Sequence, residues 1–508
     1  MVNEKKQVKR NLYFNIFSLL ANVIVGVLYT PYLVKSLGIV AYGIVPLALI
    51  INQYVSVLTG SLTSALTRFY TVSIQRKEYT EASKFLTTSF VMIFCLIIFL
   101  FAFLFLLIRD VDNVFNIPVD LLKSSKLLFF FTICSFFISL LSSVFNITLY
   151  AANRLDYLNV IKIIRTSFKL MLVFCLFELY DHNIAYVGLA NLLTEAIILT
   201  FSCYLFFKYS ESSVKLNYNL FDIQSLRVLF VMSIWVIIQQ LGDTMIYRID
   251  NVFINKYWSS KESGIIGAFT ELGTYTLIIA GVISSLFGPL ILQAYSRNEH
   301  SVVQQMTIDR SLSVGVLLAV IVGMLCGFSP IILKIWLGEG FVQYHWWLYL
   351  KLFTIPFFAA AGVFAFAARA WNRVKMPAIY TIGIGCLNLT FVWLIVKYFN
   401  FGQITIIYIL LICLIAGIVQ SYFLNGLVFT SLYQGTKKII LINFVKILSV
   451  LIMVSIIGFL LTPLFQNFNP LVSLPILALT GLLLLVLSFK VFLTKDQLNA
   501  MIALVYNK

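Results

Sequence analysis

The sequence predicts an all-α polytopic membrane protein with 14 transmembrane helices, forming two six-helix lobes in a parallel pseudo-two-fold arrangement plus two C-terminal helices. Three observations support this fold class. Of the 508 residues, 61% are hydrophobic and only 11% are charged, whereas a soluble chain of this length carries more surface charge. Apolar runs of spanning length recur throughout, and they are continuous rather than alternating, which excludes a β-barrel. Lys and Arg are distributed unevenly between these runs.

The apolar runs give the positions of the spans, and the connections between them are short. We predict spans at residues 11–34, 43–66, 85–108, 122–150, 158–180, 184–208, 226–250, 264–292, 310–333, 344–370, 376–398, 403–430, 438–463 and 471–493. The first run is of full length and lacks a signal-peptide cleavage site, so we expect it to be retained as a transmembrane helix. Without a soluble domain, the function must lie in the membrane-embedded part.

The net charge of +16 fits a positive-inside bias better than nucleic-acid binding, for which no aromatic-interleaved basic domain is present. If the N-terminus is cytoplasmic, the inner segments carry 25 Lys and Arg residues and the outer segments carry nine. The remaining two, Lys169 and Lys351, lie within spans. Both termini are therefore predicted to be cytoplasmic. The seven cysteines all lie in apolar runs without metal-ligand spacing, so neither a disulfide nor a metal site is expected.

A weak internal repeat divides the chain. Asn153-Arg154 follows the fourth span and Asn372-Arg373 follows the tenth, 219 residues later, and Gly43 and Gly264 are 221 apart. Six spans are an even number, so both copies enter the membrane from the same side, which makes the repeat parallel. We predict an N-lobe at residues 1–215, a C-lobe at 216–434 and an addition at 435–508.

The seventh span is unusually polar for a membrane segment. On a helical wheel one broad sector holds Gln239, Gln240, Asp243, Tyr247, Asp250 and Asn251. Because charged groups are costly in hydrocarbon, we interpret this sector as the wall of a polar cavity. Asp243 is the candidate proton or sodium site, with a structural ion pair as the alternative. Arg248 lies outside the sector, and ordinary solvation near the outer mouth is expected for Arg248, Asp250 and Asn251.

The first span carries an amide face, with Asn11, Asn15, Ser18 and Asn22 at helical spacing. Two interpretations remain open: packing between membrane helices, or lining of the same cavity, with Asn15 and Asn22 as contacts. Other ionisable groups in or near spans are Glu195, Glu271, Lys169 and Lys351. Lys351 lies near the outer end of its span, where its long side chain can extend to the interface. Lys169 lies deeper in its span. Glu271 lies in the outer part of its span, where it could pair with one of these cations.

Three arginines, Arg68, Arg154 and Arg373, lie at the inner ends of spans. The positive-inside bias explains them, and the alternative is a set of guanidinium forks for phosphate or pyrophosphate. We find no P-loop, no HExxH motif and no paired cysteines, and His182, His300 and His345 are scattered. Asp110-Val-Asp112 is a lone DxD motif on a short outer loop, which is weak support for a glycosyltransferase. We therefore predict that the chain is not an enzyme.

The opening of the chain resembles a known family. The spaced asparagines, Pro31, Ser36-Leu-Gly38, Ala41-Tyr-Gly43 and Ala65-Leu-Thr-Arg68-Phe-Tyr70 resemble the first two helices of bacterial O-antigen and capsule flippases of the Wzx type, within the multidrug/oligosaccharidyl-lipid/polysaccharide exporter superfamily. The Asn-Arg turn and the Gly264-to-Pro289 stretch are also similar, and the resemblance covers essentially the whole chain.

The resemblance implies a function. Such proteins move a polyprenyl-pyrophosphate-linked oligosaccharide from the inner to the outer leaflet of the bacterial cytoplasmic membrane by alternating access. It implies no cofactor, an H⁺ or Na⁺ gradient as driving force, contact with membrane lipids, and polysaccharide polymerase or assembly proteins as further partners. On this reading Arg68, Lys169 and Arg248 contact the anion, together with Asn15, Asn22, Gln239 and Gln240. Asp243 couples to the ion, with Glu271. The cavity of such proteins is typically cationic, and the acidic residues Asp243 and Asp250 of the seventh span differ from that pattern.

Three alternatives remain open. A multidrug or cation antiporter shares the architecture but usually has 12 spans. A lipid II or teichoic-type exporter is a closer relative. A membrane glycosyltransferase needs catalytic outer-loop residues, for which only the DxD motif is available.

Overall fold

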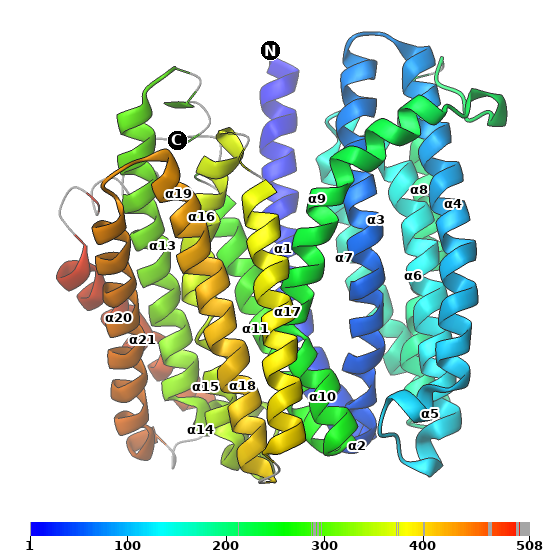
Figure 1. Ribbon diagram of the computed structural model, residues 1–508. Helices are drawn as coiled ribbons and strands as arrows, with labels where there is room; N and C mark the ends of the chain where they lie inside the picture. Colours follow the sequence, from blue (N-terminus) through cyan, green and yellow to red (C-terminus); the bar gives the residue numbers. More distant parts are fainter. Residues whose placement is uncertain are drawn as a thin grey trace. The chain divides into compact units, whose positions relative to one another are not determined.

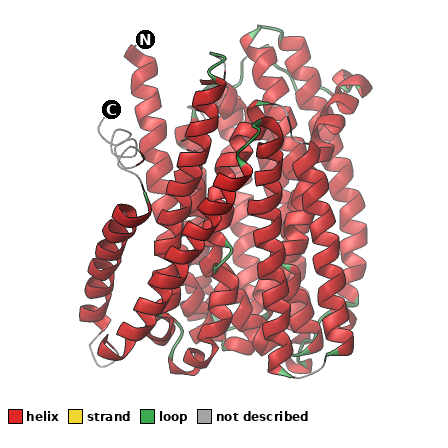
Figure 2. Cartoon of the chain, turned by 60° about the vertical axis from the view of Figure 1, so that its left-hand side comes forward, coloured by secondary structure: helices red, strands yellow, loops and turns green. Residues whose placement is uncertain are grey.

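The computed structural model describes residues 2–211, 213–285, 287, 291, 294–295, 297–371, 373, 375–399, 402–465, 470–493 and 497. Within these residues every regular element is a helix, as the sequence predicts (Figures 1 and 2). The chain forms two compact units. Unit 1 comprises Met1–Thr244 and Asn251–Ala268, and unit 2 comprises Met245–Asp250 and Phe269–Lys508.

Unit 1 contains the first eight α-helices, most of α9 and α10, and the beginning of α11. Their bounds are α1 Val2–Leu37, α2 Ile39–Tyr42, α3 Ile44–Gln75, α4 Tyr79–Arg109, α5 Val111–Val114, α6 Leu122–Ala151, α7 Leu155–Leu179, α8 Ile184–Tyr209, α9 Ile223–Tyr247, α10 Ile249–Tyr257 and α11 Ser260–Ser285. Short 3₁₀ turns at Val119–Leu121 and Tyr218–Leu220 join some of them.

Besides most of α11, unit 2 contains the remaining helices. Their bounds are α13 His300–Gly327, α14 Ser329–Trp336, α15 His345–Leu352, α16 Ile355–Ala370, α17 Lys375–Tyr398, α18 Gln403–Ile418, α19 Asn425–Leu432, α20 Lys437–Phe465 and α21 Pro470–Phe492. A 3₁₀ turn covers Glu339–Tyr344, and a π-helical turn at Val419–Leu424 joins α18 to α19. The predicted lobe boundaries at residues 215 and 434 describe the sequence repeat rather than these units, and they stay a prediction.

Eleven helical segments of the described part are long and apolar enough to cross a membrane. The chain is therefore a multi-pass membrane protein. Three predicted spans are not among the eleven: 43–66, 158–180 and 226–250. The side chains of residues 51–65 lie outside the described part, and α7 and α9 carry several charged or amide groups. The count of 14 spans thus stays a prediction.

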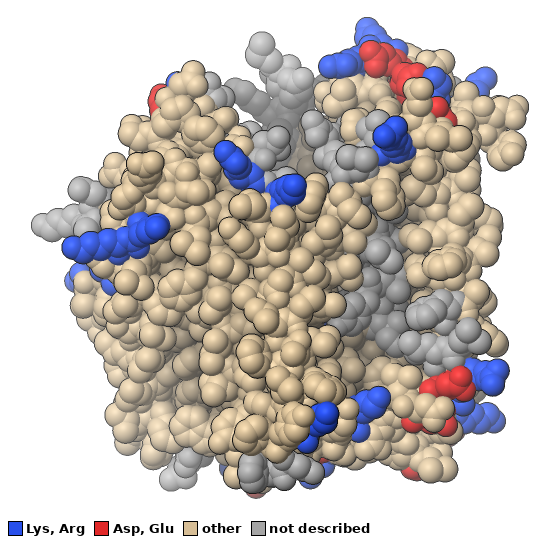
Figure 3. Space-filling model, in the orientation of Figure 1, with Lys and Arg blue, Asp and Glu red and all other residues tan. Residues whose placement is uncertain are grey.

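Charged side chains lie mostly near helix ends on the face shown in Figure 3, where the surface along the helices is largely uncharged. This distribution is the one that a hydrocarbon environment requires, because an ion in the bilayer core is costly.

Small residues allow the closest helix contacts in each unit. In unit 1, α6 packs along α8, and a Cβ at Gly188 would lie 2.9 Å from the carbonyl oxygen of Leu128. In unit 2, α13 packs along α20, and a Cβ at Gly327 would lie 2.9 Å from the Cα atom of Gly458. Membrane helices have no hydrophobic drive to associate within lipid, so such close backbone approach supplies the packing energy.

The weak sequence repeat is supported by backbone geometry at the ends of α6 and α16. The Arg154 N–H donates to the Leu149 carbonyl at 2.7 Å, and the Arg373 N–H donates to the Ala368 carbonyl at 2.8 Å. Each bond joins an N–H to the carbonyl five residues earlier, and it ends its helix in the same way. The two donors are 219 residues apart, and so are the two acceptors. The packing partners also correspond, since α4 packs on α6 and α13 packs on α16.

Gly43 and Gly264, which the repeat aligns, lie against each other in unit 1. A Cβ at Gly43 would lie 1.9 Å from the Ser260 carbonyl oxygen, and a Cβ at Gly264 would lie 2.5 Å from the Ile39 carbonyl oxygen. Neither position has room for a side chain. The start of α11 is therefore fixed directly on the α2–α3 turn.

Candidate functional site

A polar pocket of about 200 Å³ lies among four helices of unit 1. Its lining comes from α3, α6, α7 and α8 and consists of Leu49, Ser135, Phe136, Ser139, Arg165, Lys169, Asn191, Thr194 and Glu195. Glu195 is the twelfth residue of α8, so it lies roughly 16 Å along the helix from its start. The pocket is thus deep within a predicted span, where polar and charged groups are expected to serve a function.

An ion pair forms the charged wall of this pocket. The Arg165 Nε atom lies 2.6 Å from Glu195 Oε1, and Arg165 Nη2 donates to Glu195 Oε2 at 3.1 Å. The Glu195 side chain is 13% exposed. The Nη2 hydrogen bond and the close Nε–Oε1 charge contact orient Arg165 toward α8.

Lys169 lies one helical turn beyond Arg165 and supplies a second positive charge. Its ammonium nitrogen is 5.0 Å from the centroid of the Tyr29 ring of α1, within the range of a cation–π contact. The described lining residues therefore carry two positive charges and one negative charge. The sequence predicted Lys169 as an anion contact, but it did not predict Arg165 or Glu195. For Arg165 the sequence does carry a signal: it is four residues from Lys169, and residues four apart share a helix face.

The amide face of α1 serves helix packing where its contacts are described. Asn22 accepts a hydrogen bond from the Thr166 hydroxyl of α7, and its amide donates to the Ser18 carbonyl at 2.7 Å. Asn11 is buried and bonds to the α6–α7 turn, whereas Asn15 is exposed. The packing interpretation of this face thus holds for Asn11 and Asn22.

The polar sector of α9 is half-buried at Gln239, Gln240 and Asp243. The Oδ1 atom of Asp243 is buried and accepts no hydrogen bond from any residue that the structure describes. A buried carboxylate oxygen without a partner in a membrane interior favours a proton or a bound cation, which offsets the cost of the charge. The role of Asp243 as an ion site stays a prediction. The side chain of Arg68, another predicted contact, lies outside the described residues.

Two further predicted residues belong to unit 2. Arg248 stands at the break between α9 and α10, and its Nη2 donates to the Thr274 hydroxyl of α11 at 3.1 Å. Glu271 is half-buried on α11, in unit 2, whereas Asp243 belongs to unit 1.

The expectation that Asp250 is solvated and that Lys351 extends to the interface is wrong. Asp250 is fully buried, Lys351 is 11% exposed, and the Lys351 ammonium lies 2.6 Å from Asp250 Oδ2. The same ammonium is 3.5 Å from the Tyr247 carbonyl at the end of α9. A buried charge pair in unit 2 thus stabilises the break between α9 and α10.

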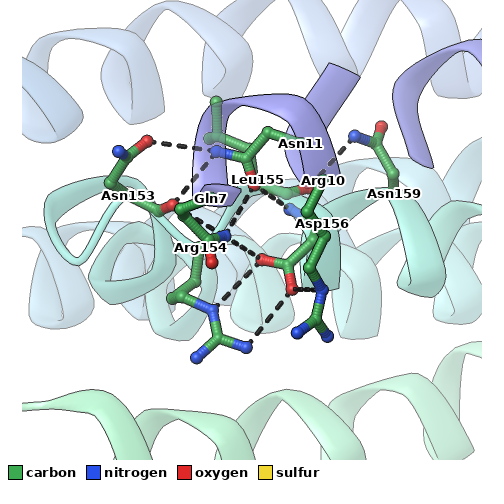
Figure 4. Close-up of polar contacts among 8 residues, drawn as sticks. All are labelled: Gln7, Arg10, Asn11, Asn153, Arg154, Leu155, Asp156 and Asn159. Atoms are coloured by element: carbon green, nitrogen blue, oxygen red, sulfur yellow. Dashed lines mark hydrogen bonds and ion pairs between the residues drawn. The ribbon is translucent and has the colours of Figure 1, made fainter. Parts of the chain in front are cut away.

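A second polar cluster attaches the N-terminal end of α1 to the α6–α7 turn (Figure 4). Asp156, which is 1% exposed, accepts from Gln7 at 2.9 Å and pairs with Arg10 at 2.9 Å. Arg154 adds two contacts to Asp156, both at 3.2 Å. Asn11 accepts from the Asp156 backbone N–H at 2.9 Å.

The charge state of this cluster follows from its contacts. Burial disfavours the ionised form of Asp156, but the bonds from Arg154, Arg10 and Gln7 outweigh it and hold its pKa below the usual value. Arg154 lies over the rings of Tyr157 and Tyr209, at 4.4 and 4.7 Å from their centroids. The cluster is therefore an ionised structural clamp, and the positive-inside reading of Arg154 is incomplete.

Comparison with known families identifies the chain's relatives. The family model described as "polysaccharide biosynthesis protein" matches residues 8–294, more than half of the chain. The chain belongs to this polysaccharide biosynthesis family.

One family relative is an uncharacterized membrane protein, EpsK, of Bacillus subtilis (strain 168). It is 27% identical over 382 residues, which cover 74% of this chain and 75% of EpsK. Among solved structures, the lipid II flippase MurJ in an inward closed conformation aligns with a TM-score of 0.71 and 16% identity, over 95% of this chain and 98% of MurJ.

A multidrug resistance transporter of the MATE family, in an inward-facing conformation, aligns with a TM-score of 0.64 and 14% identity. The alignment covers 82% of this chain and 96% of that transporter. At such identities the likeness shows the fold alone. This member of the polysaccharide biosynthesis family thus has the fold of the MOP superfamily of transporters and flippases.

Proposed function

We propose that the protein moves a polyprenyl-pyrophosphate-linked oligosaccharide, a repeat unit of a surface polysaccharide, from the inner to the outer leaflet of the bacterial cytoplasmic membrane. Movement is by alternating access, and both termini are cytoplasmic. Family membership supports the polysaccharide pathway, and the similarity to a lipid II flippase supports a lipid-linked substrate.

The observation that carries the proposal is the pair of cations on one face of α7. Arg165 and Lys169 line the pocket of unit 1 with a single carboxylate, Glu195, so the described lining has an excess positive charge. Charged groups within a membrane are costly and mark substrate or ion pathways, and an excess of positive charge suits an anion. Guanidinium and ammonium groups are the usual protein ligands of phosphate oxygens.

The pocket suits the pyrophosphate rather than the whole substrate. Its volume of about 200 Å³ is smaller than the roughly 300–1,000 Å³ of sites for drug-sized ligands. Ser139 and Asn191, which also line the pocket, carry hydroxyl and amide groups that can bond to phosphate or to the first sugar. The Ser135 and Thr194 hydroxyls donate to backbone carbonyls of their own helices. The polyprenyl chain stays in lipid.

Asp243 is our candidate for coupling to an H⁺ or Na⁺ gradient. Its buried, unpartnered oxygen supports this role, because a transported cation would compensate the charge in one state of the cycle and leave it in another.

The test is complementation in a bacterial strain that lacks its own flippase for a surface polysaccharide. The proposal predicts that the wild-type protein restores surface glycan and that Lys169→Ala and Asp243→Asn do not. Restored resistance to cationic dyes without surface glycan would favour the multidrug antiporter instead.

A further inference from the structure

We propose that a pocket at the turn between α19 and α20 binds the headgroup of an anionic phospholipid, with the acyl chains of that lipid lying along the start of α20. The pocket belongs to unit 2 and has a volume of about 560 Å³. Its lining residues are Leu427, Thr430, Ser431, Gln434, Gly435 and Lys437. This site is formed by unit 2 alone and is independent of the transport proposed above.

The pocket is open because the turn carries a glycine. Gly435 has a φ of +83°, in the left-handed region that glycine adopts without strain. No atom lies within 4 Å of the position that a Cβ of Gly435 would take. The chain therefore passes from α19 into α20 through a short turn and leaves the space beside Gln434 and Lys437 unfilled (Figure 1).

The positive charge at this turn has no counter-charge within the described chain. Lys437 and Lys438 are both exposed, and neither has a carboxylate partner among the residues that the structure describes. The surrounding sequence offers none either, since residues 340–495 contain no Asp or Glu. The available counter-charge is therefore an anion from outside the protein.

The free donors of the pocket suit a phosphate group. The hydroxyls of Thr430 and Ser431 already donate to backbone carbonyls of their own helix, at 2.9 and 2.7 Å. The side-chain donors left for a ligand are the amide of Gln434 and the ammonium of Lys437, and an ammonium is a common ligand of phosphate oxygens. The first turn of α20 contains no acidic residue, so the positive end of its helix dipole adds to the attraction.

The apolar side chains beside the pocket favour a lipid over a soluble phosphate. Leu441 and Val445 follow Lys437 at four-residue spacing, so the three side chains share one face of α20. Leu441 is 54% exposed and Val445 is 53% exposed, and Leu427 of α19 is 49% exposed. Because α20 is apolar enough to cross a membrane, this face is covered by lipid chains.

Headgroup and chains are thus accommodated on one continuous surface. A phospholipid with its phosphate at Lys437 lays its acyl chains over Leu441 and Val445. Basic pockets between membrane helices on the cytoplasmic side bind anionic headgroups in this way, and Lys437 lies on the side predicted to be cytoplasmic.

The experiment measures stabilisation of the purified protein in detergent by added lipid. The unfolding temperature is recorded during titration with dioleoyl phosphatidylglycerol or with the zwitterionic dioleoyl phosphatidylethanolamine. We expect phosphatidylglycerol to stabilise the wild type at lower concentration. In Lys437→Gln/Lys438→Gln its half-saturating concentration should rise at least about tenfold, since each lysine near an anionic lipid contributes roughly a factor of five.

Two further variants separate the pocket from general charge. Arg76→Gln/Lys77→Gln removes two adjacent exposed cations from the turn between α3 and α4, and it should keep the wild-type response. Ser431→Trp fills the pocket at an exposed position without a change of charge, and it should weaken the response as the lysine variant does.

Three outcomes would overturn the proposal. The first is an equal response to phosphatidylglycerol in Lys437→Gln/Lys438→Gln and in the Arg76→Gln/Lys77→Gln control. The second is equal stabilisation of the wild type by the two lipids. The third is equal stabilisation by water-soluble glycerol phosphate, which would assign the pocket to a soluble phosphate. Each of these outcomes leaves the proposed transport function untouched, because no substrate takes part in the measurement.

Discussion

The ammonium nitrogen of Lys351 lies 2.6 Å from Oδ2 of Asp250, and this ion pair connects α15 to the break between α9 and α10. Both side chains are taken out of solvent, so the pair stabilises unit 2 only as long as both partners are present. Removal of one partner leaves a buried charge without compensation.

The change Lys351→Met should therefore destabilise the protein by about 3 kcal/mol, since Asp250 keeps its charge in an apolar site. Thermal unfolding in detergent, followed by tryptophan fluorescence, measures this loss. The double variant Asp250→Asn/Lys351→Met should recover most of it. Lys334→Met, which removes an exposed pair with Glu339, should change stability by less than about 1 kcal/mol. Equal stability of Lys351→Met and the double variant would contradict the account.

The clamp around Asp156 should contribute to stability above acidic pH. Asp156→Asn removes the contacts to Arg10 and Arg154 and should cost about 1–3 kcal/mol at neutral pH, because a buried hydrogen-bonded carboxylate is lost. Asp112→Asn, at an exposed pair with Lys126, is the matched control and should have little effect.

The sign of the pH dependence follows from the lowered pKa of Asp156. The stabilisation is fully present above the ordinary aspartate pKa of about 4 and is lost as pH falls through the lower folded-state value. The difference between wild type and Asp156→Asn should shrink on acidification below that pH. An unchanged difference in unfolding temperature down to strongly acidic pH would mean that Asp156 is not the ionised centre of the cluster.

Gly264→Ala should disrupt the contact between α11 and the α2–α3 turn. The added Cβ would lie 2.5 Å from a backbone oxygen, so the helix must move, at a cost of about 1–3 kcal/mol. Gly281→Ala lies on the same helix with no atom within 4 Å of its Cβ, and it should be neutral or slightly stabilising. The two variants are compared by thermal unfolding, and equal effects would show that the glycine contact is unimportant.

Much of the fold was accessible from sequence, because apolar run length sets span position in a bilayer. The repeat was predicted from Asn153-Arg154 and Asn372-Arg373, and the backbone bonds at Arg154 and Arg373 support it. Sequence spacing also placed Lys169 deep in the membrane, and the pocket of unit 1 includes it.

Long-range partners were not accessible. Asp250 and Lys351 are 101 residues apart, and Arg165 and Glu195 are 30 apart, so neither pair has a helical periodicity that would reveal it. Without its partner in view, Asp250 resembled a solvated residue near a helix end. The same limit applies to the amide face of α1, where packing is distinguished from cavity lining by long-range contacts: Thr166 with Asn22, and the α6–α7 turn with Asn11.

The variant Asp243→Asn should remain folded and lose its dependence on the driving ion. No ion pair is broken, since the buried oxygen has no partner in the described part of the chain. Transport by reconstituted protein would be measured with and without a pH or Na⁺ gradient, with the exposed Asp181→Asn as control. A gradient response that Asp243→Asn retains in full would remove Asp243 from ion coupling.

The central claim is movement of a lipid-linked oligosaccharide, and a reconstituted flipping assay tests it most directly. Vesicles that carry the protein and a radiolabelled undecaprenyl-pyrophosphate-linked sugar in the inner leaflet are treated from outside with a membrane-impermeant glycosidase. We predict that wild-type protein makes the inner pool accessible and that Lys169→Ala slows this at least about tenfold, which corresponds to about 1.4 kcal/mol of lost stabilisation. Release of label no faster than from protein-free vesicles would contradict the account.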